Sequence, residues 1–364
     1  MPRLRRRQGR LREGGGLKEV PLSDLIGAAL SAGFDAAGIV DPELLAAEAP
    51  RVRSLANGGW YAKENLGDLE TDWLLRPERL RESVILICAL SCFRDEPDDG
   101  SSEADPHALI APFARRNHYG AAIDMLRAAA AVFGPGLGIR AKGIRFFSNS
   151  RLPERSFLLA SGLAARGANA LALMPGLGSL FVVAGAVIPF SRARFRAAPA
   201  TPMADPCGSC RLCRDACPVG AIVQPGLVDP DICLESLAAR TGIWDPAMKE
   251  KWGFRLYGCQ DCQAVCPQNR GLRTSSAVKK GEIGPSVSIA KLLSLGTEGV
   301  RALFKGTALG MRWIPPEALI RNALVAAGNR RNPVLRSAIE RYADSGSAFI
   351  ADAARWASTR CRAR

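Results

Sequence analysis

Cysteine spacing constrains this chain more than any other feature. Of its 11 cysteines, eight fall between Cys207 and Cys266. The stretch CGSCRLCRDACP places Cys207, Cys210, Cys213 and Cys217 at the spacing C-x2-C-x2-C-x3-C-P, which is the ligand run of bacterial ferredoxins. In that run the first three cysteines bind one 4Fe-4S cluster, and the fourth binds another. The spacing therefore predicts two clusters.

A second group, CQDCQAVCP, supplies three cysteines at C-x2-C-x3-C-P and is one cysteine short of the full run. Cys233, upstream of it, is the natural replacement. Eight ligands then serve two clusters. The first cluster takes Cys207, Cys210, Cys213 and Cys266, and the second takes Cys217, Cys233, Cys259 and Cys262.

Zinc and disulfides are the alternatives for so many cysteines. A zinc ribbon also uses paired C-x2-C groups, but its four ligands do not explain the longer repeated spacing. No secretory signal precedes the cysteines, so a reduced, cytoplasmic location is expected. Cys88 and Cys92 fall on an apolar strand and Cys361 in a frayed tail, and we interpret all three as non-ligands.

The chain divides by composition into four parts. Residues 1–16 are a basic, flexible tail, and residues 17–195 alternate helical and strand patterns, which predicts an α/β domain. Residues 196–275 form a ferredoxin-like domain that is too poor in large apolar residues to fold without metal, and residues 276–364 are helical. The fold class is α+β.

Within the first domain, the patterns predict strands at 33–40, 83–93 and 144–147 and helices at 117–133 and 153–166. From Gly167 to Ser191 there is no charged side chain, which is long enough to cross a bilayer. Pro175, Gly176 and Gly178 interrupt it, so we favour a hairpin of two buried strands, 170–174 and 180–188, over a membrane span.

Positive charge is concentrated at the two ends of the chain. The net charge is +14, and residues 276–364 hold 15 Lys or Arg against six Asp or Glu. Apolar residues recur at helical spacing over 289–304, 316–329 and 332–359, which predicts short stacked helix pairs. A polyanion is expected to meet these basic ends first.

Several stretches along the chain, the cysteine groups among them, resemble the epoxyqueuosine reductase family, which is related to the corrinoid reductive dehalogenases. They are GFDAAGIV, RPERLRESVILICAL, LPERSFLLASGLAARGAN, GLGSLFVVAGAVI, YGCQDCQAVCPQN and IRNALVAAGN. The resemblance implies a nitroreductase-like domain that binds base-off cobalamin and HEAT-like helices that bind a tRNA anticodon stem-loop. It also implies a flavodoxin or ferredoxin as electron donor and a monomeric protein that converts epoxyqueuosine in tRNA to queuosine.

The family's proton-donating aspartate is replaced here by Ser148, whose hydroxyl is far less acidic than a carboxyl. The candidate catalytic residues are therefore Ser148, His118, Tyr119 and Glu154, and the candidate cofactor-binding residues are Arg76, Ser148, Asn169, Gln260 and Asp261. Two rival functions follow from the replacement: the same architecture acting on another substrate, or a non-catalytic electron carrier or RNA-binding protein.

Overall fold

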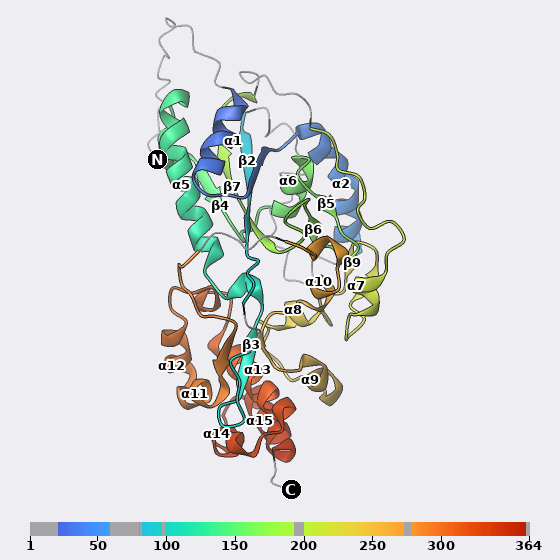
Figure 1. The fold of residues 1–364 in the computed structure, drawn as a ribbon, viewed down its shortest axis with the longest axis vertical. Helices are drawn as coiled ribbons and strands as arrows, with labels where there is room; N and C mark the ends of the chain where they lie inside the picture. The colour runs from blue at the N-terminus through green and yellow to red at the C-terminus, as the bar shows by residue number, and fades with distance from the viewer. Residues whose placement is uncertain are drawn as a thin grey trace, which may run out of the picture.

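The computed structural model describes residues 21–58, 80, 82–96, 99–192, 200–272 and 278–361. A sheet flanked by helices occupies one end of the molecule, and the last five helices occupy the other (Figure 1). The elements of the cysteine-rich region lie along one side between them. The tail at 1–16 and Arg76 fall outside the described residues.

The first sheet has four antiparallel strands in the order β1-β2-β7-β4. Their bounds are Ala36–Ile39 for β1, Val84–Ser91 for β2, Phe181–Ile188 for β7 and Arg145–Phe147 for β4. The two long central strands pair along their full length, from Val84 opposite Ile188 to Ser91 opposite Phe181. All eight residues of β2 are buried, which explains why VILICALS is apolar without alternation.

Helices cover both faces of this sheet, as Figure 1 shows. One face packs against α1 (Leu22–Ser31) and α5 (His118–Leu137), and the other against α2 (Pro42–Asn57) and α6 (Glu154–Ala160). Close packing requires a glycine in β7, because a Cβ on Gly185 would lie 2.3 Å from the Phe147 ring. The predicted mixture of helix and strand is therefore confirmed.

Two local predictions in this domain are wrong. The helix expected over 153–166 ends at Ala160, and Ala165–Arg166 is a short strand, β5, because Gly162 turns the chain with a φ of 74°. The expected hairpin does not form either. The first of its strands, β6 (Ala172–Leu173), pairs with β5, whereas β7 pairs with β2 and β4.

A second sheet joins distant parts of the chain. Its central strand, β3 (His107–Ile110), lies between β10 (Arg255–Tyr257) and β11 (Ser286–Ser288). The β3–β10 pair is parallel and the β3–β11 pair antiparallel. The segment between β2 and α5 thus leaves the first domain and completes a sheet with the cysteine-rich and helical regions.

The cysteine-rich region consists of short elements. These are α7 (Leu212–Asp215), β8 (Ile222–Gln224), β9 (Leu227–Val228), α8 (Leu234–Leu237), α9 (Pro246–Trp252) and α10 (Asp261–Ala264). Its apolar side chains, among them Leu234, Trp244 and Trp252, pack in one core with those of the last helices. The expectation that metal alone holds this region together is therefore incomplete, because the region shares a core with its neighbour.

The last five helices form one packed unit with α13 at its centre. They are α11 (Ile289–Ser294), α12 (Gly296–Leu303), α13 (Pro316–Arg330), α14 (Arg336–Glu340) and α15 (Ala348–Arg360). The first predicted helix breaks in two at Gly296, which has a φ of 63°. α13 is buried on all sides, against α9, α11, α12, α15 and β10. This packing makes α13 the axis of the helical end.

No helix in the described ranges is long and apolar enough to cross a membrane. The three cysteines outside the ligand groups are all buried. The prediction of a frayed tail around Cys361 is wrong, since its thiol is fully buried and donates to the carbonyl of Ala327 at 3.3 Å.

Candidate iron-sulfur centres and the adjoining cavity

The eight cysteines form two groups of neighbouring thiols. Burial raises the pKa of Cys213, and the charges of Cys207, Cys266 and Cys210 raise it further. These four thiols, Cys207, Cys210, Cys213 and Cys266, are called the first quartet. The grouping matches the ligand set predicted for one cluster.

The second quartet consists of Cys217, Cys233, Cys259 and Cys262. Burial raises the pKa of Cys262 to about 12, with further contributions from Cys259 and Cys233. Burial also raises the pKa of Cys233, and the neighbouring Cys217 adds to that increase. Cys213 of the first quartet acts on Cys262 as well, so the two groups are adjacent.

Backbone amides point at one sulfur in each quartet. The Ala168 N–H donates to Cys207 Sγ at 3.3 Å, and the Ala221 N–H donates to Cys217 Sγ at 3.2 Å. Such hydrogen bonds are one of the means by which proteins set cluster potentials. Ala168 lies between β5 and β6, so the first domain contacts the first quartet directly.

The donor set fits clusters better than single ions. Among the described residues, no three His, Cys, Asp or Glu side chains converge closely enough to hold one metal ion. A 4Fe-4S cluster is larger than one ion, so its four thiolates stand further apart around it. Four sulfurs per group and no mixed nitrogen or oxygen ligands match that requirement.

Asn269 fastens the second C-x3-C-P segment to the first domain. Its Oδ1 accepts from the Ser179 N–H at 2.7 Å, and its Nδ2 donates to the Gln263 carbonyl at 2.8 Å. A Cβ on Gly178, whose φ is 56°, would lie 2.0 Å from Asn269 Oδ1. The PGLGS segment is therefore a docking turn for the cysteine-rich region.

A cavity of about 480 Å³ lies between the first domain and the second quartet. The first domain contributes apolar surfaces from Phe113 and the start of β7, and polar groups from Tyr119, Glu154 and Asn169. The opposite wall includes all four thiols of the second quartet, together with Glu235, Asp261 and Gln263. We call this space the inner cavity.

Glu154 is the candidate acid that the inner cavity places best. Its two carboxylate oxygens accept from the backbone N–H groups of Asn149, at 3.0 Å, and Ser150, at 2.6 Å. Burial raises its pKa to about 7 in spite of these hydrogen bonds, which favour the ionised form. Near neutral pH, Glu154 is therefore divided between a proton-donating and a proton-accepting form.

Ser148 and His118 do not line the inner cavity. The Ser148 hydroxyl donates to the Val183 carbonyl at 2.7 Å, one residue away from the lining residue Asn149. His118 is buried with Nδ1 near the carbonyls of Phe113 and Arg116, and burial lowers its pKa to about 4. An imidazole that is neutral at pH 7 is a poor acid, so the position of His118 does not support a catalytic role.

The other predicted residues divide between two hollows. Tyr119 and Asn169 line the inner cavity, and the Asn169 side chain also hydrogen bonds to the Cys262 thiol. Burial raises the pKa of Tyr119 well above its usual value. Asp261 lines the inner cavity too, but its carboxylate is paired with Arg255, at 2.6 Å. Gln260 does not line the inner cavity; it lines another hollow, which Arg255 and Asp261 also border.

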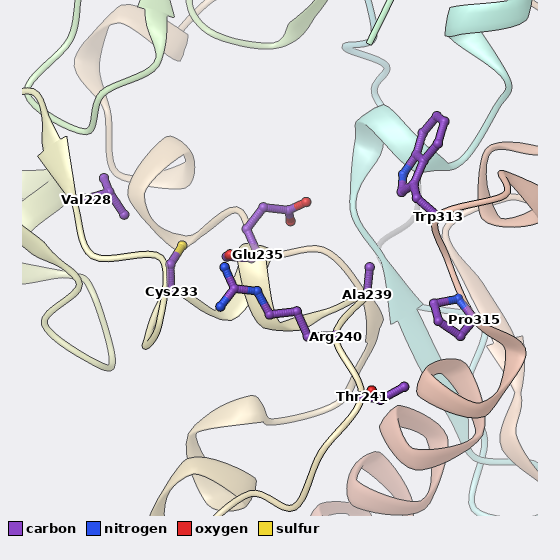
Figure 2. Close-up of a pocket in the computed structure, with 9 residues that line it drawn as sticks. Val228, Cys233, Glu235, Ala239, Arg240, Thr241, Trp313 and Pro315 are labelled. Carbon is purple, nitrogen blue, oxygen red and sulfur yellow. The ribbon is translucent and has the colours of Figure 1, made fainter. Parts of the chain in front are cut away.

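Glu235 was missed by the sequence analysis. It lines the inner cavity, and its Oε2 accepts from the Cys259 N–H at 2.9 Å. The side chain also borders a second, larger hollow, where Figure 2 shows its carboxylate extending to the side on which Trp313 lies. Its place two residues after Cys233 was the only available signal.

Two adjacent thiol quartets in a ferredoxin-like region define an iron-sulfur protein with two 4Fe-4S clusters. Residues 206–269 match the family model described as a 4Fe-4S double cluster binding domain. This confirms the strongest sequence prediction.

Relatives extend the likeness over most of the chain. The epoxyqueuosine reductase of Cyclobacterium marinum is 30% identical over 241 residues, which are 65% of this chain and 76% of that protein. The Bacillus subtilis enzyme of that name is 28% identical over 316 residues, 83% of this chain and 78% of the relative. The match to the Alicycliphilus denitrificans enzyme spans only 61% of its length, at 31% identity. The chain belongs to the epoxyqueuosine reductase family.

Solved structures show the same fold. An epoxyqueuosine reductase crystallised with an epoxyqueuosine-modified tRNA stem loop superposes with a TM-score of 0.74 over 93% of this chain and 90% of the other, at 24% identity. The Streptococcus thermophilus epoxyqueuosine reductase gives 0.77, with 93% and 90% covered, at 19% identity. The arrangement of sheet, cysteine-rich and helical regions is therefore that of this family.

Proposed function

We propose that this protein reduces epoxyqueuosine in tRNA to queuosine, using two 4Fe-4S clusters and base-off cobalamin. The reaction takes two electrons and two protons, converts the epoxide to an alkene, and releases the oxygen as water. One observation carries the proposal. A single cavity is walled on one side by a helix-covered sheet and on the other by all four thiols of the second quartet.

The residues present fit a large, flat cofactor with amide side chains. Phe113, Leu180 and Val182 give the inner cavity apolar surfaces on which a corrin ring can lie. Asn169 and Gln263 offer side-chain amides at the same wall. No histidine of the described residues lines the cavity, in keeping with a corrin bound without a histidine ligand. The proposal includes a nitroreductase-like fold for the first domain.

Bound cobalamin would supply a reduced, nucleophilic cobalt for opening the epoxide, and the quartets would hold the one-electron carriers that keep it reduced. The protein's own residues would position the substrate and donate the proton to the epoxide oxygen. A cluster held by the second quartet would occupy the end of the cavity between the four thiols, so no layer of protein would separate it from a cofactor in the rest of the cavity. The apolar lining from β7 excludes water from the reacting atoms.

Glu154 is the proposed proton donor in place of the family's aspartate. It lines the cavity, its pKa is raised to about 7, and two backbone amides fix its carboxyl at the start of α6. Ser148 would then act by shaping the loop before α6, through its hydrogen bond to Val183. Tyr119 faces the same space and completes the polar lining.

The helical end is the proposed docking surface for the tRNA anticodon stem-loop. It carries 15 Lys or Arg against six Asp or Glu over residues 276–364, which favours a phosphate backbone. The proposal includes a HEAT-like arrangement for helices α11 to α15. A flavodoxin or ferredoxin is the proposed electron donor, and the protein is proposed to act as a cytoplasmic monomer.

The test is turnover by anaerobically reconstituted protein. Iron should reach about eight atoms per chain, and added cobalamin should stay bound through gel filtration with a base-off spectrum. With a strong reductant, an epoxyqueuosine-containing stem-loop should lose one oxygen in mass spectrometry. Unchanged epoxide in a protein with full iron and reducible cobalamin would instead favour a different substrate, and failure to retain cobalamin would favour a non-catalytic role.

A further inference from the structure

A second cavity, of about 780 Å³, adjoins the inner one and is not used by the proposed chemistry. Figure 2 shows it between α8 with the loop after it and the loop that precedes α13. Val228, Cys233 and Glu235 line both spaces, so the two cavities share a wall. We call this space the outer cavity. It is the larger hollow, and it lies beside the second quartet.

We propose that the outer cavity receives unpaired bases of the tRNA loop and that Trp313 stacks on one of them. The inference rests on the proposed function and deepens it. A base inside a folded loop cannot reach a buried centre unless it leaves its stack. A cavity that shares a wall with the inner one is where the displaced nucleotide and its neighbours would lie.

Trp313 differs from the other tryptophans that the structure describes. Trp244 and Trp252 are buried and pack against each other with ring centroids 4.9 Å apart. Trp356 lies under the cations of Lys249 and Arg360. Trp313 is 49% exposed, and no ring, cation or hydrogen-bonding group of the described residues contacts its indole. An uncovered indole at a cavity is a stacking platform of the kind that single-stranded nucleic acids use.

Two arginines near Trp313 can meet a phosphate, although the Glu235 carboxyl lines the same cavity. Arg240 lines the outer cavity and is paired with Asp231, at 3.2 Å. Arg312 precedes Trp313 and lines a smaller hollow that shares Pro315 with the outer cavity. Arg312 is exposed, and within the described ranges no carboxylate lies at ion-pair distance from it. An indole in the cavity wall, next in the chain to a guanidinium that has no carboxylate partner among the described residues, matches a base and its phosphate.

The experiment measures binding of two RNA probes to the reconstituted full-length protein. One probe is a fluorescent, unmodified anticodon stem-loop, and the other is a blunt RNA duplex of equal nucleotide count. Trp313→Ala should weaken stem-loop binding about tenfold, because stacking of one base is worth about that much. Trp313→Phe, which keeps a ring, should restore most of the affinity. Duplex binding should not change in either variant, since a duplex offers no free base.

Salt dependence separates stacking from charge. Trp313→Ala should leave the slope of log affinity against log salt unchanged. Arg312→Gln should make that slope shallower by about 1, which corresponds to the loss of one phosphate contact. Val132→Ala, which removes an exposed apolar group on α5, is the surface control and should change neither quantity. Iron content and the visible spectrum should be those of the wild type in every variant, which excludes damage to the nearby second quartet.

The outcomes separate this inference from the proposed function. Equal stem-loop affinity in wild type and Trp313→Ala, or an equal loss on stem-loop and duplex, would overturn the role of Trp313 even if the wild type reduces epoxyqueuosine. A wild type that binds the stem-loop through Trp313 but leaves the epoxide unchanged would support the inference and refute the proposed reaction.

Discussion

Replacing Arg321 should damage the second quartet from a distance. Arg321 is 1% exposed in α13, and its guanidinium lies 3.5 Å from the centre of the Trp244 ring. It donates to the carbonyls of Leu237, at 3.1 Å, and Gly242, at 3.2 Å. Both carbonyls belong to the segment that follows Cys233, so α13 holds the position of a cluster ligand.

The magnitude follows from what Arg321→Met leaves behind. Two partly buried carbonyls lose their donors, at about 1–3 kcal/mol each. Removing a buried charge offsets part of that cost, because burial already lowers the pKa of Arg321 to about 9. We expect a net loss of about 2–3 kcal/mol of folding free energy. Iron should fall from about eight atoms per chain toward about four as the second cluster becomes labile.

The assay is denaturant unfolding of reconstituted protein, followed by cluster absorbance and circular dichroism, with iron measured on the same samples. Arg336→Met is the matched control, since Arg336 is exposed and pairs with Glu340, at 2.7 Å, one turn away. It should leave the unfolding midpoint and the iron content unchanged, because exposed ion pairs contribute little. Arg321→Lys should resemble Arg321→Met, because lysine lacks the planar fork that reaches both carbonyls. If Arg321→Met and Arg336→Met unfold alike with full iron, the anchoring argument is wrong.

Three further outcomes test the chemistry. Wild-type kcat should fall as pH rises through about 7, because Glu154 must be protonated to donate a proton. Glu154→Gln should lower kcat by about 10²–10⁴-fold and should remove that fall from the pH–rate profile. Ser148→Asp returns a carboxyl to the loop before α6 and should raise single-turnover rates about tenfold or more, whereas no change would show that position 148 donates no proton. Cys233→Ser should reduce iron from about eight to about four atoms per chain, while Cys361→Ser, which alters a buried thiol outside the quartets, should leave about eight.

The two-cluster domain could be predicted from the sequence because the cysteine spacing is itself the geometry. A short loop with cysteines two residues apart can only wrap a centre of limited size, so spacing translates directly into structure. Strands β2 and β7 could also be predicted from the sequence, since a strand buried on both faces is apolar along its length. The helix α5 was predicted from the pattern of the chain, and the structure shows that Asn117 caps it.

Pairing partners could not be predicted in the same way. The two uncharged strands around Pro175 look like a hairpin because they are close in sequence, yet β6 joins β5 and β7 joins the main sheet. The competing influence is Asn269, from the cysteine-rich region, which occupies the turn and fixes Ser179. Likewise, nothing local marks His107–Ile110 as the centre of a sheet with strands far along the chain. Tertiary contacts decided both cases.

The proposed electron carriers and the proposed proton donor are positioned by separate elements. The residues that deliver protons can therefore differ from those of the family while the thiol quartets stay the same. The second quartet is positioned by backbone groups and by α13, through contacts such as Arg321 to Leu237 and Asn322 to Leu256, at 2.9 Å. The proposed proton-donating side depends on the loop from Ser148 to Glu154, in which the Ser148 hydroxyl donates to the Val183 carbonyl of β7 and the Glu154 carboxylate accepts from the amides of the loop itself. A change at position 148 therefore alters proton delivery without moving a thiol. Ser148→Asp should accordingly change turnover while leaving cluster content and reduction by dithionite as in the wild type, and an altered cluster spectrum in that variant would contradict the separation.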